Sequence, residues 1–158
     1  MAERIVINTG PLIVLSRIEA LDIVGHLPYR FICPDAVRLE LDKGESAGHP
    51  RIAPTWLQVI PPATAPSPII LAALDLGEAA VIHLALEQKV RIVCIDEWKG
   101  RRAALASGLK VTGVLGLLAR AKSVGIIQEM TPFVEKALRS GVRYHPDLVR
   151  KVLEMVKE

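Results

Sequence analysis

Residues 91–102 read Arg-Ile-Val-Cys-Ile-Asp-Glu-Trp-Lys-Gly-Arg-Arg. The largely apolar run over residues 91–95 predicts a strand of a parallel sheet that is buried on both faces. Two adjacent carboxylates, Asp96 and Glu97, follow where this strand would end, and a basic turn comes after them. Because the carboxyl ends of parallel strands form the ligand crevice of an open α/β sheet, we expect both carboxylates to lie in such a crevice.

Strand-like and helical segments alternate along the rest of the chain. The strand-like segments are residues 4–8, 31–33, 56–60, 91–95 and 110–112. Helical patterns begin at Pro11 and Pro34, as expected for proline at a first helical position, and recur at 69–74, 76–88, 99–107, 114–124, 132–139 and 146–157. We expect an α/β fold, with the 91–95 strand central in a parallel sheet that helices cover on both faces.

Length and composition suit one domain with an aliphatic core. Of the 158 residues, 51% are hydrophobic, but only 4% are aromatic. The glycine- and proline-rich residues 42–68 read as a surface connection inside that domain, because neither side alone completes a core. No apolar run reaches the roughly 18–20 residues of a membrane span, and the N-terminus carries no signal-like segment, so we expect a cytoplasmic protein.

Cysteine and histidine usage argues against several classes of site. Cys33 and Cys94 lie inside apolar strand-like runs, which favours buried free thiols over a disulfide or metal pair. The four histidines are scattered, so a zinc site is not expected. The first strand is not followed by the glycine pattern of a dinucleotide site or by the acidic pair of a phosphotransfer receiver.

Positive charge is concentrated in the half of the chain that contains the 91–95 strand. The formal net charge is +3, but residues 89–122 contain eight Lys or Arg against only Asp96 and Glu97. A basic region around a small acidic cluster suits a polyanion bound close to a metal. The alternative is a solubilising helix face.

Five residues could bring side-chain oxygens together near helix starts and strand ends: Asn8, Glu40, Glu78, Asp96 and Glu97. Mg²⁺ and similar hard cations bind carboxylate oxygens together with water and substrate phosphate. Such ions activate water and clamp the oxygens of a phosphodiester during hydrolysis. Carboxylates from separate elements are therefore what this chemistry requires.

Four of these five residues, all except Glu97, also have a purely structural interpretation. Asp75 and Glu78 form a capping-box pattern, and Asp96 could cap the helix after its strand. Glu40 in mid-helix could be a solvated surface residue, and Asn8 could bond the local backbone of a turn. These interpretations leave the order and spacing of the residues unexplained.

That order resembles the successive motifs of PIN domains, and in particular the prokaryotic branch that begins Asn-Thr-Ser-Pro-Leu-Ile. The similar segments are Ile-Asn-Thr-Gly-Pro-Leu-Ile (7–13), Pro-Asp-Ala-Val-Arg-Leu-Glu-Leu (34–41), Leu-Asp-Leu-Gly-Glu-Ala-Ala-Val-Ile-His-Leu-Ala (74–85) and Ile-Asp-Glu-Trp-Lys-Gly-Arg-Arg-Ala-Ala (95–104). The Gly-Leu-Lys-Val-Thr-Gly-Val-Leu-Gly-Leu-Leu segment (108–118) also fits. The similarity covers about residues 4–125.

The resemblance implies a three-layer α/β/α fold with a central parallel sheet and a Mg²⁺- or Mn²⁺-dependent ribonuclease site. It assigns catalysis to Glu40, Glu78 and Asp96, and metal binding to these three with Asn8 and the auxiliary Glu97. Thr9 would steady the first motif through its hydroxyl, and Lys99, Arg101 and Arg102 are the expected RNA-binding residues. We interpret residues 1–158 as a single PIN-like domain, with 126–158 as its C-terminal helical extension.

Many relatives in this family are VapC-type toxins, which form homodimers and are inhibited by a small antitoxin. The resemblance therefore implies RNA, a cognate antitoxin and a second copy of the chain as partners, with no membrane. Asn8 stands where most active relatives have Asp, Gly10 where they have a small polar residue, and Cys94 where many have Thr or Ser. We expect the lost charge at Asn8 to weaken metal binding, and a catalytically impaired nucleic-acid- or protein-binding module is the alternative.

Overall fold

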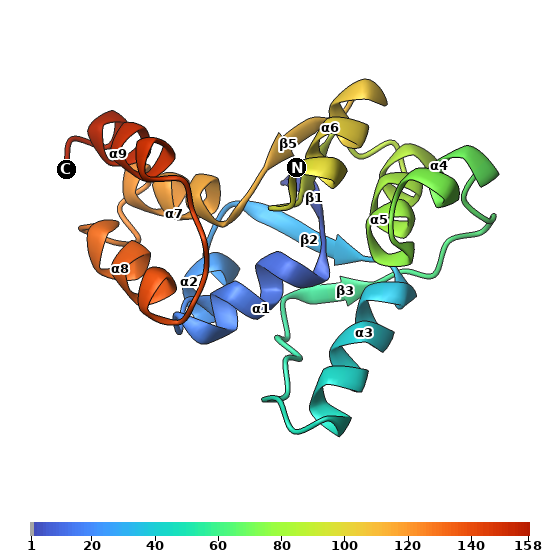
Figure 1. The fold of residues 1–158 in the computed structure, drawn as a ribbon, viewed down its shortest axis with the longest axis horizontal. Helices are drawn as coiled ribbons and strands as arrows, with labels where there is room; N and C mark the ends of the chain where they lie inside the picture. The colour runs from blue at the N-terminus through green and yellow to red at the C-terminus, as the bar shows by residue number, and fades with distance from the viewer. Residues whose placement is uncertain (1) are drawn as a thin grey trace.

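The computed structural model describes residues 2–158 and contains one parallel five-stranded sheet (Figure 1). Its strands are β1 (Glu3–Ile7), β2 (Tyr29–Cys33), β3 (Leu57–Val59), β4 (Ile92–Cys94) and β5 (Lys110–Thr112). Their order across the sheet is β3-β2-β1-β4-β5, and every pairing is parallel. The predicted parallel sheet is confirmed, but the middle strand is β1 and not the 91–95 segment, because the chain places β2 on one side of β1 and β4 on the other.

The helices cover the sheet on both faces, which gives the three-layer α/β/α architecture expected of a PIN-like fold. Figure 1 shows α7, α8 and α9 together at one end of the molecule and α4 and α5 at the other. The helices are α1 (Thr9–Arg17), α2 (Leu21–Gly25), α3 (Asp35–Ser46), α4 (Pro68–Ala73), α5 (Leu76–Glu87), α6 (Trp98–Ala106), α7 (Val114–Ser123), α8 (Thr131–Arg139) and α9 (Pro146–Met155). No helix in residues 2–158 is long and apolar enough to cross a membrane.

Three local predictions differ from the structure. Helix α1 begins at Thr9, so Pro11 is its third residue and not its first. Helix α3 continues to Ser46 and so includes the first five residues of the segment interpreted as a loop; this polar helix buries Val37 and Leu41 on one side. The short helix α2 was not predicted, since five residues are too few to show a helical period.

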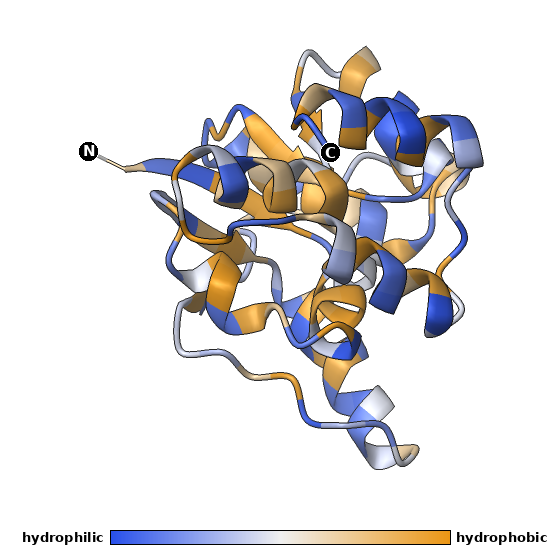
Figure 2. Ribbon diagram, turned by 90° about the vertical axis from the view of Figure 1, so that its left-hand side faces the viewer, coloured by the Kyte–Doolittle hydropathy of each residue, from blue (hydrophilic) through white to orange (hydrophobic). Residues whose placement is uncertain are grey.

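The core is aliphatic and runs through the middle strands. Ile5, Val6 and Ile7 of β1 and Val93 of β4 are at most 1% exposed, which agrees with their continuous apolar sequence. Figure 2 shows this as hydrophobic strands inside helices that carry both hydrophobic and hydrophilic residues. Cys33 and Cys94 are buried and free, as predicted, and burial raises the pKa of the Cys33 thiol to about 12.

The segment after residue 125 packs on the same core. Met130, Val134 and Ala137 are buried in it, and Val149 and Val152 of α9 pack against it from the outside. This packing supports the interpretation of residues 1–158 as one domain, which stays a prediction.

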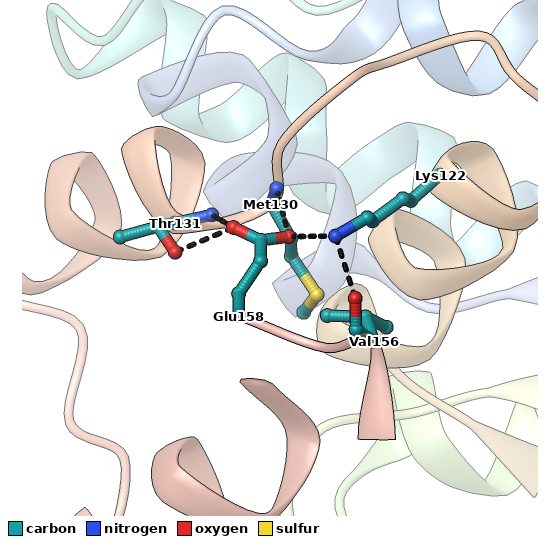
Figure 3. A network of polar contacts seen from close by, with 5 residues as sticks. All are labelled: Lys122, Met130, Thr131, Val156 and Glu158. Atoms are coloured by element: carbon teal, nitrogen blue, oxygen red, sulfur yellow. Dashed lines mark hydrogen bonds and ion pairs between the residues drawn. The ribbon is translucent and has the colours of Figure 1, made fainter. Parts of the chain in front are cut away.

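Glu158, which follows α9, joins that helix to α7 and α8 (Figure 3). Its side chain is only 11% exposed. One carboxylate oxygen accepts hydrogen bonds from Lys122 Nζ at 2.8 Å and from the backbone N–H of Met130 at 2.7 Å. The other accepts from the backbone N–H of Thr131 at 2.9 Å and from its hydroxyl at 2.6 Å. Glu158 therefore supplies the side-chain cap that the N-terminus of α8 lacks locally.

We predict that Glu158→Ala lowers the free energy of unfolding at neutral pH by about 1 kcal/mol, as loss of a helix cap does. Burial acts to raise the pKa of Glu158, but its hydrogen bonds from Lys122, Thr131 and Met130 lower it to about 2 from an ordinary 4.5. The carboxylate therefore stabilises the fold above pH 4.5 and loses this effect as the pH falls towards 2. Urea unfolding at both ends of that range measures the difference, which must shrink at low pH.

The control for this prediction is Glu129→Ala, which removes an exposed acid near the same helix end. It is expected to leave stability unchanged at both pH values. A loss for Glu158→Ala that does not depend on pH would contradict the proposed role of the charge.

Candidate metal centre

The order in which the chain adds strands reverses between β1 and β4. After β1 the chain adds β2 and β3 on one side, and it then crosses over to add β4 and β5 on the other side. Ligand sites of open α/β sheets form at such a point, beyond the carboxyl ends of the strands. Asn8 follows β1 there and Asp96 lies just beyond β4. The backbone N–H of Asn8 donates to the Cys94 carbonyl at 3.0 Å, which fixes the two strand ends against each other.

Three carboxylates gather beside these strand ends. Oxygen atoms of Asp75, Glu78 and Glu97 lie within 4.8 Å of one another, a spacing at which one cation could bind all three. Glu78 and Glu97 are predicted ligands, whereas the sequence suggested only a capping role for Asp75. Asp75 does cap α5, since its Oδ1 accepts from the Glu78 backbone N–H at 2.8 Å, and it also belongs to the acidic group.

Glu78 is the most perturbed of these groups. It is only 3% exposed, and burial together with the neighbouring Asp75 and Glu97 raises its pKa to about 8. In the described residues its carboxylate does not return a hydrogen bond to the Asp75 backbone N–H, so the capping box is half formed. The Glu78 carboxylate is thus buried among like charges, an arrangement that a cation would relieve.

Asp96 and Glu40 lie outside this group of three, but both line the same pocket as Asp75 and Glu97. Asp96 Oδ1 accepts from the backbone N–H of Val114 at 3.0 Å. Burial raises the pKa of Asp96, although Val114 and Arg101 act in the opposite direction. Burial and the Asp75 carboxylate likewise raise the pKa of Glu40.

Four predicted residues carry a buried side-chain oxygen that has no hydrogen-bond partner within residues 2–158. These atoms are Asn8 Oδ1, Thr9 Oγ1, Glu78 Oε2 and Asp96 Oδ2. Asn8 precedes α1, yet its side chain makes no capping bond, so a local turn role does not account for it. Each buried acceptor left unpaired costs about 1–3 kcal/mol, and oxygen acceptors are the ligands that Mg²⁺ and Mn²⁺ prefer. The donor set therefore fits a hard divalent cation.

Three glycines, none of which was predicted to be part of the site, leave room for carboxylates where a larger residue would displace them. A Cβ at Gly77 would overlap Glu40 Oε1, one at Gly100 would overlap Glu78 Oε2, and one at Gly113 would overlap Asp96 Oδ1. None of them has a positive φ, so close approach and not backbone conformation requires glycine here. Their only signal in the sequence is that each lies inside one of the recognised PIN-like segments.

The pocket has a volume of about 940 Å³ and extends from the acidic residues to the C-terminal helices. Of the predicted RNA-binding residues, Arg101 lines this pocket and its Nη1 donates to the Ile95 carbonyl at 2.8 Å. Lys99 and Arg102 are exposed on α6, and the Arg102 guanidinium lies 5.9 Å from the centre of the Trp98 ring. Sequence reasoning did not include the pocket residues Arg143, Tyr144 and His145, which belong to no recognised motif.

We predict that Gly113→Ala weakens Mn²⁺ binding by about tenfold, a loss typical of disturbing the surroundings of a metal ligand. The new Cβ would displace Asp96 Oδ1 and lie 3.0 Å from Arg101 Nη1. Calorimetric titration with Mn²⁺ measures the affinity. Gly10→Ala is the matched control, since Gly10 lines the same pocket but a Cβ there meets nothing within 4 Å. Equal affinities for the two variants would argue against the glycine contact.

We also predict that Mn²⁺ affinity rises with pH up to about 8 and then levels off, because the metal must displace the proton of Glu78. Glu78→Gln should bind Mn²⁺ more weakly and lose this pH dependence, since its amide does not titrate. Titrations of both proteins between pH 6 and about 9 test this. A wild-type affinity that does not change over that range would contradict the assignment of Glu78 as a ligand.

Comparison with known proteins agrees with this geometry. No curated protein matches the chain. A family model described as a PIN domain (DUF3368) matches residues 4–158, well beyond residue 125, where the recognised motifs end. PIN domains are generally metal-dependent nucleases with this three-layer fold, and an acidic cluster that could bind a metal is present in this chain. The chain therefore belongs to the PIN-domain family.

Proposed function

We propose that the protein is a metal-dependent endoribonuclease that hydrolyses RNA phosphodiester bonds with an activated water. The observation that carries this proposal is the cluster of Asp75, Glu78 and Glu97, beside which Glu78 and Asp96 each keep a buried carboxylate oxygen without a hydrogen-bond partner in the described residues. Apolar residues at these positions would not carry the free-energy cost of burying unpaired carboxylates. The presence of carboxylates there therefore supports a site that binds a cation.

The residues fit distinct roles around Mg²⁺ or Mn²⁺. Asp75, Glu78 and Glu97 would hold a cation between them, and Asp96 would offer its free Oδ2 while Val114 fixes its other oxygen. The bound ion supplies a water of lowered pKa and offsets the negative charge of the phosphodiester. Glu40 contributes one more carboxylate from α3.

Basic residues next to the acidic cluster would hold the polyanion. Arg101 lines the pocket, and its positive charge acts to lower the pKa of Asp96. Lys99 and Arg102 are exposed on the same helix. Arg101 would therefore act near the cleaved phosphate, and Lys99 and Arg102 would bind flanking phosphates.

A toxin role with a protein inhibitor is part of this proposal. Leu39, Leu76 and Trp98 are 58%, 65% and 68% exposed, and each lies next to or within two residues of a site carboxylate. We take these exposed apolar side chains, which neighbour the acidic residues in the sequence, as support for a protein partner that covers the site. We propose a cognate antitoxin and a homodimer as the relevant assemblies, and the cytoplasmic location stays a prediction.

Asn8 supports the second candidate function, a PIN-fold binding module with impaired catalysis. Its amide oxygen is buried and unpartnered at the end of β1, so it can still accept a cation. It brings no negative charge to offset that of the metal. The site would therefore bind a metal more weakly than one with Asp at this position, and this weaker binding would reduce or prevent catalysis.

We predict that the wild-type protein cleaves single-stranded RNA slowly in Mn²⁺, and that Asn8→Asp increases the rate by at least tenfold through tighter metal binding. Glu78→Gln and Asp96→Asn should abolish cleavage, whereas Glu129→Gln, which changes an exposed acid outside the pocket, should not. Cleavage of a labelled RNA is followed by gel electrophoresis alongside Mn²⁺ titrations. If Asn8→Asp binds Mn²⁺ more tightly and neither protein cleaves, the binding-module function is favoured.

A further inference from the structure

The C-terminal arm, defined here as residues 142–152, forms one wall of the candidate metal pocket. Val142, Arg143, Tyr144 and His145 line the 940 Å³ pocket that also contains Asp96 and Glu97. Leu148 and Val152 of α9 line it as well. None of these residues belongs to the acidic motifs, so the pocket is larger than the metal centre requires.

Tyr144 has the most unusual environment in the arm. Its phenol oxygen is buried and has no hydrogen-bond partner in the described residues. Burial first, and then the nearby Asp96 and Cys94, raise the pKa of the phenol, so the group keeps its proton. Tyr144 is thus a hydrogen-bond donor with no acceptor, next to the site where a phosphodiester would be cleaved.

The pocket that Tyr144 lines also has an apolar lining. It consists of Ile13 and Val14 of α1, Leu115 of α7, and Leu148 and Val152 of α9. Arg143 lies at the same wall and is exposed. The pocket therefore combines an acidic side for a metal, an apolar side for a flat uncharged group, and a cation between the pocket and solvent.

A nucleotide has this combination of properties, because its phosphate is charged and its base offers apolar faces with hydrogen-bond acceptors at the edge. An apolar peptide side chain could fill the same space, but it would leave the Tyr144 hydroxyl unpaired and would not use Arg143. The charges and the unpaired donor favour the nucleotide.

The wall is held in place before any ligand binds. Glu158 joins the end of α9 to Lys122 of α7 and to the N-terminus of α8, as Figure 3 shows. At the other end of α9, His145 Nδ1 accepts from the Asp147 backbone N–H at 3.1 Å. A fixed wall reduces the ordering that a bound base would otherwise require.

Resting on the proposed nuclease function, we propose that the C-terminal arm is a nucleobase-binding subsite of the metal pocket. One unpaired base of the substrate occupies the apolar side, the Tyr144 hydroxyl donates to an acceptor on that nucleotide, and Arg143 pairs with an adjoining phosphate. A base can enter only when it leaves its stack, so this subsite selects single strands over duplexes.

The test measures binding separately from cleavage. Fluorescence anisotropy in Ca²⁺ compares a labelled single-stranded RNA, the same strand with abasic positions, and the duplex. Tyr144→Ala should weaken single-strand binding by about tenfold or more, as loss of a base contact does, and Tyr144→Phe and Arg143→Gln by smaller factors. Tyr29→Phe and Arg120→Gln are matched controls, since both residues lie outside the pocket, and each should change affinity less than about twofold.

Mn²⁺ titration of the same variants supplies the second readout. Tyr144→Phe should bind Mn²⁺ as the wild type does, because the hydroxyl that it lacks donates to the nucleotide and does not contact the metal. An equal loss of Mn²⁺ and RNA affinity would overturn the subsite and make Tyr144 a support for Asp96. The abasic strand needs no variant, so equal binding of the abasic and intact strands overturns the subsite even if Tyr144→Ala does not fold.

The outcomes also distinguish this subsite from the proposed function. Base-dependent binding that is lost in Tyr144 variants, without any Mn²⁺-dependent cleavage, would support the subsite and contradict the nuclease. Mn²⁺-dependent cleavage that is unchanged in Tyr144 and Arg143 variants would support the nuclease and overturn the subsite. Absence of nucleic-acid binding by the wild type would also overturn it and leave a protein side chain as the occupant.

Discussion

The parallel pairing of β1 with β4 is the constraint on which the rest of this structure depends. It aligns Ile7 with Cys94, and the next hydrogen bond joins the Asn8 backbone N–H to the Cys94 carbonyl. The two strands are far apart in the sequence, yet the pairing places the residues that follow them at one edge of the sheet. The helices that carry Glu78 and follow Glu97 are positioned relative to that edge, since α5 packs against both strands and α6 packs against α5 and β5.

Electrostatic repulsion is the cost of this arrangement. Carboxylate oxygens of Asp75, Glu78 and Glu97 lie within 4.8 Å of one another, and burial together with these two neighbours raises the pKa of Glu78 to about 8. Gly100 leaves room for the Glu78 carboxylate in this group, and Gly77 and Gly113 leave room for those of Glu40 and Asp96. A bound cation would relieve the repulsion, and that gain in free energy would be part of the binding energy of the metal.

The C-terminal residues add to the site a wall that the acidic motifs do not provide. Helices α7, α8 and α9 gather at one end of the molecule (Figure 1), and the Glu158 carboxylate joins all three. The connection between α8 and α9 thereby comes to lie beside Asp96. The match of the family to residues 4–158 agrees with an architecture in which these helices are integral to the domain.

The fold class and most of the elements were predictable from the sequence, because aliphatic strand runs and helical periods are local patterns. Ordered acidic motifs also sufficed to recognise a PIN domain. Three findings came from the three-dimensional structure alone: β1 is the middle strand, Asp75 belongs to the acidic group as well as capping α5, and Tyr144 lines the pocket. These facts depend on contacts between residues distant in the chain, and no local pattern of hydrophobicity or spacing records which distant surfaces will pack together.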